Sequence, residues 1–214
     1  AAGAIVLIDA AQSIAHLPTD VQSIGADFLA FSGHKIYAPT GIGILWGRKN
    51  LLEELPPWQG GGEMIKEVTF DHTTYNDPPF KYEAGTPNIE GAIALAAAID
   101  YVNRIGLEKI HAHEASLIHR AAGAISDIQG IRLYGPADRS GSLSFNIEGL
   151  HHYDIGTLLD QMGVAVRTGH HCCQPLMKRF GMTGTVRASF ALYNTLEEIN
   201  TFAQSLEKAV GMLR

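Results

Sequence analysis

The stretch Ser32-Gly-His-Lys-Ile-Tyr-Ala-Pro-Thr-Gly-Ile-Gly43 lies between two apolar runs, Ala26-Asp-Phe-Leu-Ala-Phe31 and Gly41-Ile-Gly-Ile-Leu-Trp46. A third apolar run, Ala4-Ile-Val-Leu-Ile8, stands near the start of the chain. Continuous runs of this kind, bounded by Gly and Pro, are typical of strands buried on both faces of a parallel sheet. We therefore predict an α/β fold that contains three such strands. Because a buried strand needs neighbours and covering helices, we expect the chain to be the later part of a longer protein.

The composition is that of a compact globular protein. The 214 residues are 46% hydrophobic and 18% charged, which excludes disorder as the dominant state. Sixteen Lys and Arg against 22 Asp and Glu give a net charge of -6, so nucleic acid is not an expected partner. No apolar stretch reaches the roughly 18 residues that cross a bilayer, and no basic segment begins the chain. We expect a cytoplasmic protein without a membrane partner.

The rest of the chain divides at about residue 102. Residues 55–88 contain many Pro and Gly residues, which predicts loops and a hairpin. Apolar residues at helical spacing follow over 89–105 and 107–128, and Gly106 separates the two helices. The remaining elements are strands at 131–134, 142–147, 164–167 and 186–190, and helices at 153–162 and from the capping box at Thr195 to 213. We thus predict part of a large α/β domain at 1–102 and a small α+β domain at 103–214.

Two polar residues follow the first two predicted strands. Asp9 comes directly after the first strand, and Lys35 lies just beyond the second. The carboxyl ends of parallel strands meet at one edge of a sheet, where ligands bind. A lysine that forms a Schiff base, opposite a carboxylate that keeps a pyridinium protonated, is what pyridoxal phosphate requires. Either residue alone is more commonly a turn cap or a solvated amine, so only the pair carries this prediction.

Four motifs resemble those of one enzyme family. The segment Ser32 to Gly43, preceded by Asp9-Ala-Ala-Gln12, resembles the cofactor segment of the class V aminotransferase branch of fold-type-I pyridoxal phosphate enzymes. Arg167-Thr-Gly-His-His-Cys172 resembles the signature of the group II, SUF-type cysteine desulfurases, which include selenocysteine lyases. Glu83-Ala-Gly-Thr-Pro-Asn88 and Val186-Arg-Ala-Ser189 match the same family in the same order. The resemblance covers essentially the whole chain, which looks like the C-terminal half of such an enzyme.

The resemblance implies roles for the cofactor residues. Lys35 would be the Schiff-base lysine, and Asp9 would face the pyridine nitrogen of pyridoxal 5'-phosphate. The remaining implied contacts are Gln12 with the phenolic oxygen, Ser32 and His34 with the phosphate, and Thr86 with the phosphate bound to the neighbouring subunit of a homodimer. Further cofactor contacts of the family lie before the segment that matches Ala1.

The resemblance also implies how the substrate is handled. Arg187 would bind the substrate carboxylate, for which a planar guanidinium is well suited. Arg167 is a second candidate for this role, with an ordinary salt bridge as its alternative. Cys172 would be the nucleophile that takes sulfur from L-cysteine and releases alanine. Its alternative is a small buried apolar residue. Cys173 departs from the family pattern, which commonly has a small residue at this position. We expect its role to be secondary to that of Cys172.

The function implied is that of a cysteine desulfurase. It would supply sulfur for iron-sulfur cluster assembly through an acceptor protein of the SUF system, with L-selenocysteine as a possible second substrate. The alternatives are another class V enzyme, such as an aminotransferase in which Cys172 has no role, and a non-catalytic fragment that needs the missing half.

A metal site is a further alternative, because four consecutive residues are of the types that bind zinc: His170, His171, Cys172 and Cys173. Four consecutive residues do not readily close one tetrahedral site, so no metal is expected.

Overall fold

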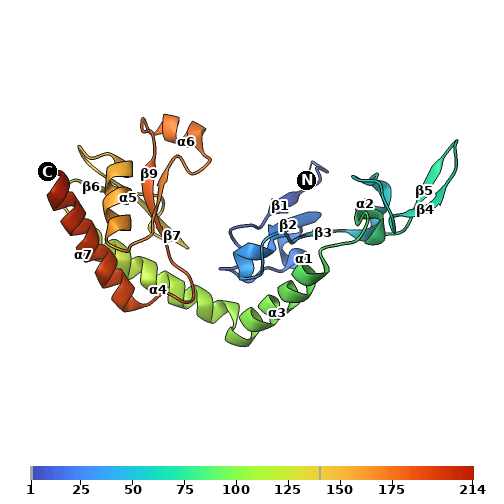
Figure 1. Cartoon of the computed structure of the whole chain (residues 1–214), viewed down its shortest axis with the longest axis horizontal. Coiled ribbons are helices and arrows are strands. Elements are labelled where there is room, and N and C mark those ends of the chain that lie inside the picture. Colours follow the sequence, from blue (N-terminus) through green and yellow to red (C-terminus); the bar gives the residue numbers. More distant parts are fainter. Residues whose placement is uncertain (1, 140) are drawn as a thin grey trace. The chain divides into compact units, whose positions relative to one another are not determined.

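The computed structural model divides into two compact units, Ala1–Leu107 and Glu108–Arg214. It describes residues 2–139 and 141–214, and each unit is treated by itself. In Figure 1 the first unit runs from blue to green and the second from green to red. In the described part of the chain, every helix is too short or too polar to span a bilayer.

A three-stranded sheet forms the centre of the first unit. Strand β1 (Leu7–Asp9) pairs with β2 (Phe28–Ser32) in parallel, as predicted. Strand β3 (Gly43–Gly47) pairs with β2 in the antiparallel direction, so the prediction of a third parallel strand is wrong. The reason lies in the connection, because a parallel pair needs a crossover of a dozen or more residues. Residues 33–42 are too few, and they return the chain directly beside β2.

The burial expected for the first strand is also wrong for this chain. Ile5 and Leu7 are 62% and 57% exposed, whereas a strand inside a parallel sheet is covered on both faces. The reason is that, among the described residues, β1 has a strand neighbour on one side only. Phe28 and Leu29 on the central strand β2 are buried, so the apolar core of the unit lies at β2 rather than at β1.

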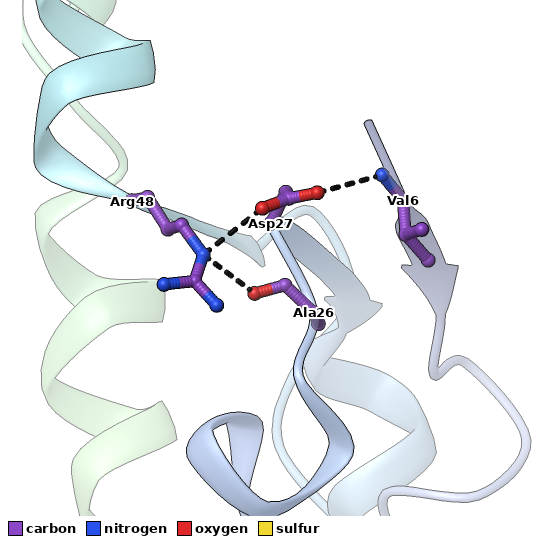
Figure 2. A network of polar contacts seen from close by, with 4 residues as sticks. All are labelled: Val6, Ala26, Asp27 and Arg48. Carbon is purple, nitrogen blue, oxygen red and sulfur yellow. Dashed lines mark hydrogen bonds and ion pairs between the residues drawn. The ribbon is translucent and has the colours of Figure 1, made fainter. Parts of the chain in front are cut away.

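A carboxylate at one end of the sheet connects the beginnings of β1 and β2 with the end of β3 (Figure 2). Asp27, directly before β2, accepts a hydrogen bond from the backbone N–H of Val6 at 2.9 Å, next to β1. Its other oxygen pairs with Nε of Arg48, directly after β3, at 2.9 Å. The same Nε lies 3.2 Å from the carbonyl oxygen of Ala26. This one side chain therefore holds the outer strands against the central one.

The hairpin and the long helix of the first unit follow the predicted pattern, whereas the short helices at 21–24 and 49–54 were not predicted. The breaker-rich segment forms a hairpin, as predicted, and the helix predicted over 89–105 begins at an Asn88 cap that accepts from the N–H of Gly91. The elements are α1 (Val21–Ile24), the 3₁₀ turn η1 (Gly33–Ile36), α2 (Lys49–Glu54), β4 (Ile65–Val68), β5 (Thr73–Tyr75), the 3₁₀ turn η2 (Phe80–Tyr82) and α3 (Ile89–Ile105).

The second unit packs α4 (Leu107–Ile125), α5 (His152–Gln161) and α7 (Leu196–Leu213) against one face of an antiparallel sheet (Figure 1). The strand order is β6-β7-β9-β8, and all three pairings are antiparallel. Apolar residues from α4, α5, α7, β7 and β9 form one core. The elements are α4 (Leu107–Ile125), β6 (Ile131–Tyr134), β7 (Ser142–Ile147), α5 (His152–Gln161), β8 (Arg167–Gly169), α6 (Gln174–Arg179), β9 (Thr185–Ser189) and α7 (Leu196–Leu213).

Two details of the second unit bear on the predictions from sequence. The strand predicted at 164–167 is displaced, because the chain pairs with β9 only from Arg167 to Gly169. Val164 and Val166 pack against the core without belonging to a strand. The capping box at the start of α7 is confirmed, since the Thr195 side chain accepts from Glu198 N and the Glu198 carboxylate accepts from Thr195 N.

Replacing Asp27 tests the role of this carboxylate. We expect Asp27→Asn to lower the free energy of unfolding by about 1–2 kcal/mol, because an amide cannot accept from both a backbone N–H and a guanidinium. Urea denaturation of the chain measures this loss. The matched control is Glu53→Gln, which removes an exposed pair with Lys49 and should cost no more than about 0.5 kcal/mol. Equal losses for the two variants would contradict the role given to Asp27.

Candidate active site

One edge of the first sheet collects the residues predicted for a cofactor. Asp9 ends β1 directly opposite Ala30 of β2, and β2 ends two residues later at Ser32. The turn η1, which carries His34 and Lys35, follows at once. Since β1 and β2 are parallel, their carboxyl ends lie at the same edge of the sheet. The structure thus places Asp9 and the turn with Lys35 on neighbouring strand ends.

The conformation of the turn depends on Gly33. Its N–H donates to the carbonyl of Ile42 at 2.8 Å, which closes the loop between β2 and β3. A Cβ atom at this position would lie 2.7 Å from the Cγ2 atom of Ile42 and 3.1 Å from its carbonyl oxygen. Ser32 Oγ and His34 Nδ1 lie 2.7 Å apart, so a hydroxyl and an imidazole share one corner beside the exposed Lys35.

The other two predicted cofactor residues have fewer contacts. Gln12 is exposed in the turn after β1, where Asp9 Oδ1 accepts the N–H of Ala11 at 2.9 Å. Asp9 therefore also caps its own turn, which was its alternative role. Thr86 is exposed in the loop before α3. Within the described residues, no recorded contact joins Thr86 to the edge that carries Asp9 and Lys35, so its role across a dimer stays a prediction.

The chemistry of this edge fits pyridoxal phosphate. Asp9 offers a carboxylate for a pyridinium nitrogen, and the exposed amine of Lys35 can condense with an aldehyde. The adjoining hydroxyl of Ser32 and imidazole of His34 can donate to a phosphate. Gly33 keeps the turn compact at the point where a side chain would displace Ile42.

A second group of predicted residues lies on the outer face of the sheet in the second unit. Arg187 of β9 is the register partner of Arg167 on β8 and of Ser144 on β7. Residues alternate between the faces of a strand, so these three side chains share a face. Phe145 and Val186, their neighbours along the chain, are buried in the core on the opposite face. The sheet therefore separates two arginines from the apolar interior.

The two guanidinium groups give this face positive charge, which would favour an anion. Burial lowers the pKa of Arg187 from its usual value, and the nearby charge of Arg167 lowers it further, although Cys173 acts in the opposite direction. The Nε atom of Arg187 is buried and has no hydrogen-bond partner in the part of the chain that the structure describes. Like charges directly opposite each other on paired strands repel, so a bound carboxylate would relieve the repulsion.

Cys172 lies in the loop that follows β8 and reaches back to this face. Arg167 Nη2 donates to Cys172 Sγ at 3.7 Å, so its recorded partner is a sulfur rather than the carboxylate of a salt bridge. Cys172 is exposed, which contradicts its alternative as a buried apolar residue. A thiol beside a guanidinium and open to solvent has the surroundings of a reactive cysteine.

His171 holds the same loop and was given no role from the sequence. Its Nε2 atom lies 2.9 Å from Thr185 Oγ1 and 3.2 Å from the Thr185 carbonyl oxygen. Burial lowers the pKa of His171, and the charge of Arg187 adds to this effect. The contact spans 14 residues and follows no periodicity, so the only sequence signal was the position of His171 in the motif.

A metal site is not formed by these side chains. In residues 2–139 and 141–214, no group of three or more His, Cys, Asp and Glu side chains is arranged to hold a metal ion. Cys173 donates to the carbonyl of His170 at 3.0 Å, and Cys172 faces Arg167, so the two sulfur atoms have different partners.

Comparisons with known proteins bear on the family of the chain. The profile of the aminotransferase class-V family matches residues 1–202. The chain belongs to the class V aminotransferase family. It is 50% identical to a cysteine desulfurase of Yersinia pseudotuberculosis over all of its length, which is 53% of that relative. The chain thus spans about half the length of the curated relatives it matches.

Solved structures of class V relatives show the same fold. The cysteine desulfurase CsdA of Escherichia coli superposes with a TM-score of 0.94 at 43% identity, over 98% of this chain and 52% of that one. The apo cysteine desulfurase of Thermococcus onnurineus NA1 has a TM-score of 0.94 at 45% identity, over 98% of this chain and 53% of that one. The resemblance drawn from the four motifs and the fold-type-I architecture are therefore confirmed.

Two histidines of the second unit, His152, which is buried, and His171, which is half-buried, predict how stability depends on pH. Burial lowers the pKa of His152, which is 5% exposed, as it does that of His171. Unfolded histidine takes up a proton near pH 6.5. As the pH falls below about 6.5, the unfolded state binds more protons, so the free energy of unfolding decreases until the folded-state pKa values are passed. For His152 the decrease is at most about 1.4 kcal/mol per pH unit.

Urea denaturation at a series of pH values measures this dependence. We expect His171→Gln to make the pH dependence shallower, because the variant has one buried imidazole fewer. The matched control is His119→Gln on the exposed side of α4, which should leave the slope unchanged. Equal slopes for the unmodified chain and His171→Gln would show that His171 is not held neutral by the fold.

Proposed function

We propose that the chain is the part of a cysteine desulfurase that carries the reactive lysine and cysteine. The observation that carries the proposal is Cys172 Sγ held by Arg167, on the sheet face where Arg187 lies directly opposite Arg167. A nucleophilic sulfur beside a carboxylate-binding guanidinium suits a substrate that carries both a thiol and a carboxylate. The similarity to cysteine desulfurases supports L-cysteine as that substrate.

Arg187 is proposed to bind the carboxylate of the substrate. It lines a cavity of about 460 Å³ together with Ser144, His171 and Cys173. A bidentate guanidinium–carboxylate pair fixes the orientation of the substrate as well as its position. The buried Nε of Arg187 would gain the acceptor that it lacks. Arg167, which already contacts Cys172, would hold the sulfur of the nucleophile in place.

Pyridoxal 5'-phosphate is the proposed cofactor. When bound, it supplies an electron sink for the bonds at the substrate's α-carbon. Lys35 would hold it covalently, and Asp9 would keep its ring nitrogen protonated. The other residues proposed to contact it are Gln12, at the phenolic oxygen, Ser32 and His34, at the phosphate, and Thr86, from the neighbouring subunit of a homodimer.

The sulfur transfer itself is assigned to Cys172. Its thiolate attacks the sulfur of L-cysteine, and a sulfur–sulfur bond forms as the sulfur–carbon bond breaks. Cys172 keeps the transferred sulfur as a persulfide, and the carbon skeleton takes up a proton and leaves as L-alanine. The exposure of Cys172 would let an acceptor protein of the SUF system collect this sulfur for iron-sulfur cluster assembly.

Two finer points complete the proposal. L-selenocysteine is a possible second substrate, because it carries the same carboxylate and a more acidic selenol. The proposed location is the cytoplasm, where thiols stay reduced, since both cysteines of the chain are free.

The first test concerns Lys35. The chain is incubated with pyridoxal phosphate, reduced with borohydride and mapped by mass spectrometry of its peptides. We expect modification at Lys35 in preference to other lysines, and its loss in both Lys35→Ala and Lys35→Arg, because a guanidinium does not condense with an aldehyde. The control is Lys49→Arg, which removes another exposed amine of the same unit. Modification spread evenly over all lysines would favour a fragment that does not form the cofactor site.

The second test separates a desulfurase from other class V enzymes. The cofactor-loaded protein is mixed with L-cysteine, and the peptide that contains residues 172 and 173 is weighed. We expect one added sulfur atom on Cys172, and a loss of alanine formation of at least about a hundredfold in Cys172→Ser. Cys173→Ser is the control and should keep most of the activity. An amino group transferred to a keto acid, without a sulfur adduct, would instead indicate an aminotransferase.

A further inference from the structure

Two cysteines stand side by side in the sequence, and the loop places them in opposite chemical roles. Cys172 Sγ accepts a hydrogen bond from the guanidinium of Arg167 at 3.7 Å and is exposed. Cys173 Sγ donates to the carbonyl oxygen of His170 at 3.0 Å and is half-buried. A sulfur that accepts from a guanidinium and is open to solvent is in the surroundings of a reactive cysteine, whereas a sulfur whose S–H donates to a carbonyl has that hydrogen engaged.

The backbone that separates the two thiols is unusual. His171 and Cys172 have φ values of 51° and 61°, in the left-handed region that residues other than Gly rarely adopt. Two such residues in succession persist only where surrounding contacts hold them. The loop contributes a hydrogen bond from the N–H of Cys172 to His170 Nδ1 at 3.1 Å and one from the N–H of Cys173 to His170 O at 2.9 Å. Both of these lie within the loop and do not attach it to the sheet.

The attachment to the sheet is made by His171. Its Nε2 atom meets both the hydroxyl and the carbonyl of Thr185, which is 2% exposed and lies two residues before Arg187 on β9. Because a carbonyl oxygen only accepts, this contact assigns a hydrogen to Nε2, and among the described residues the buried Nδ1 atom has no partner. A proton on Nδ1 would be both unpaired and repelled by the cations nearby.

We propose that His171, bound to Thr185, is the positioning residue that makes Cys172 rather than Cys173 the reactive thiol. This inference rests on the proposed function only for the identity of the reaction, because the selection between the thiols is a property of the loop. Without the contact, His171 and Cys172 relax toward negative φ, and Cys172 Sγ leaves Arg167. Cys172 then loses the guanidinium contact that distinguishes it from Cys173, and the two thiols become similar in reactivity.

The charged and titratable groups around His171 favour its neutral form. Arg187 faces it from β9, Arg167 from β8, His170 from the loop and His152 from α5. None of these groups offers a negative charge to the ring. We therefore expect acidification to act like loss of the contact, with the selectivity between the thiols decreasing at low pH.

The test is competitive alkylation of the chain with iodoacetamide, without cofactor or cysteine. Mass spectrometry of the peptide that contains both thiols gives the ratio of modification at Cys172 to that at Cys173. We expect a ratio of at least about ten in the unmodified chain, and a ratio within about twofold of one in His171→Ala. Thr185→Val, which removes only the hydroxyl, should give an intermediate ratio, and Thr185→Ser should restore the original one.

A matched control distinguishes positioning from general destabilisation. Phe202→Leu alters the core of the same unit on α7, far along the chain from the loop, and should lower stability without changing the ratio. The proposal is overturned if His171→Ala and Thr185→Val keep the original ratio, or if Phe202→Leu lowers it equally. The two proposals can also fail separately. If the ratio of Cys172 to Cys173 modification depends on His171 but the protein forms no sulfur adduct with cysteine, the desulfurase is refuted and the positioning role of His171 remains.

Discussion

The carboxylate of Asp27 is the constraint on which the sheet edge that carries Asp9 and Lys35 depends. It binds the backbone just before β1 and the arginine just after β3, so the three strands are joined at the end opposite to Lys35. With that end held, the parallel register places Asp9 opposite Ala30, and the turn that carries Lys35 begins three residues later. The edge is therefore positioned from its far end, by a residue that has no chemical role of its own.

In the second unit, the alternation of side chains along the strands determines where the candidate site residues lie. Each strand of the sheet turns every second side chain toward the helices, and the apolar core fixes which side chains these are. Arg187 must then point outward, opposite Arg167, because its neighbours Val186 and Ala188 are buried. The repulsion between the two guanidinium groups is a local cost that the packing of the core offsets, and under the proposed function a bound substrate carboxylate would relieve it.

The sequence predicted the elements better than their connections. The strand pattern and the motifs placed Asp9 and Lys35 at neighbouring strand ends, because both depend on local periodicity. The predicted direction of β3 was wrong, because the direction depends on the length of the segment between the strands. The predicted position of β8 was displaced, because Val164 and Val166 have the pattern of strand residues but pack against the core outside the sheet. The contact of His171 with Thr185 was missed because it joins residues far apart in the chain, with no pattern to indicate it.

The cysteine loop shows why residue type alone does not identify a nucleophile. Cys172 and Cys173 are the same residue at adjacent positions, so composition and motif distance hardly distinguish them. The two differ in the role of each sulfur in its hydrogen bond: Cys172 Sγ accepts from Arg167, whereas Cys173 Sγ donates to the carbonyl oxygen of His170. That difference follows from two left-handed residues, which need a contact to the sheet to persist. A second cysteine is therefore tolerated beside the first as long as the backbone keeps its sulfur in the role of a donor.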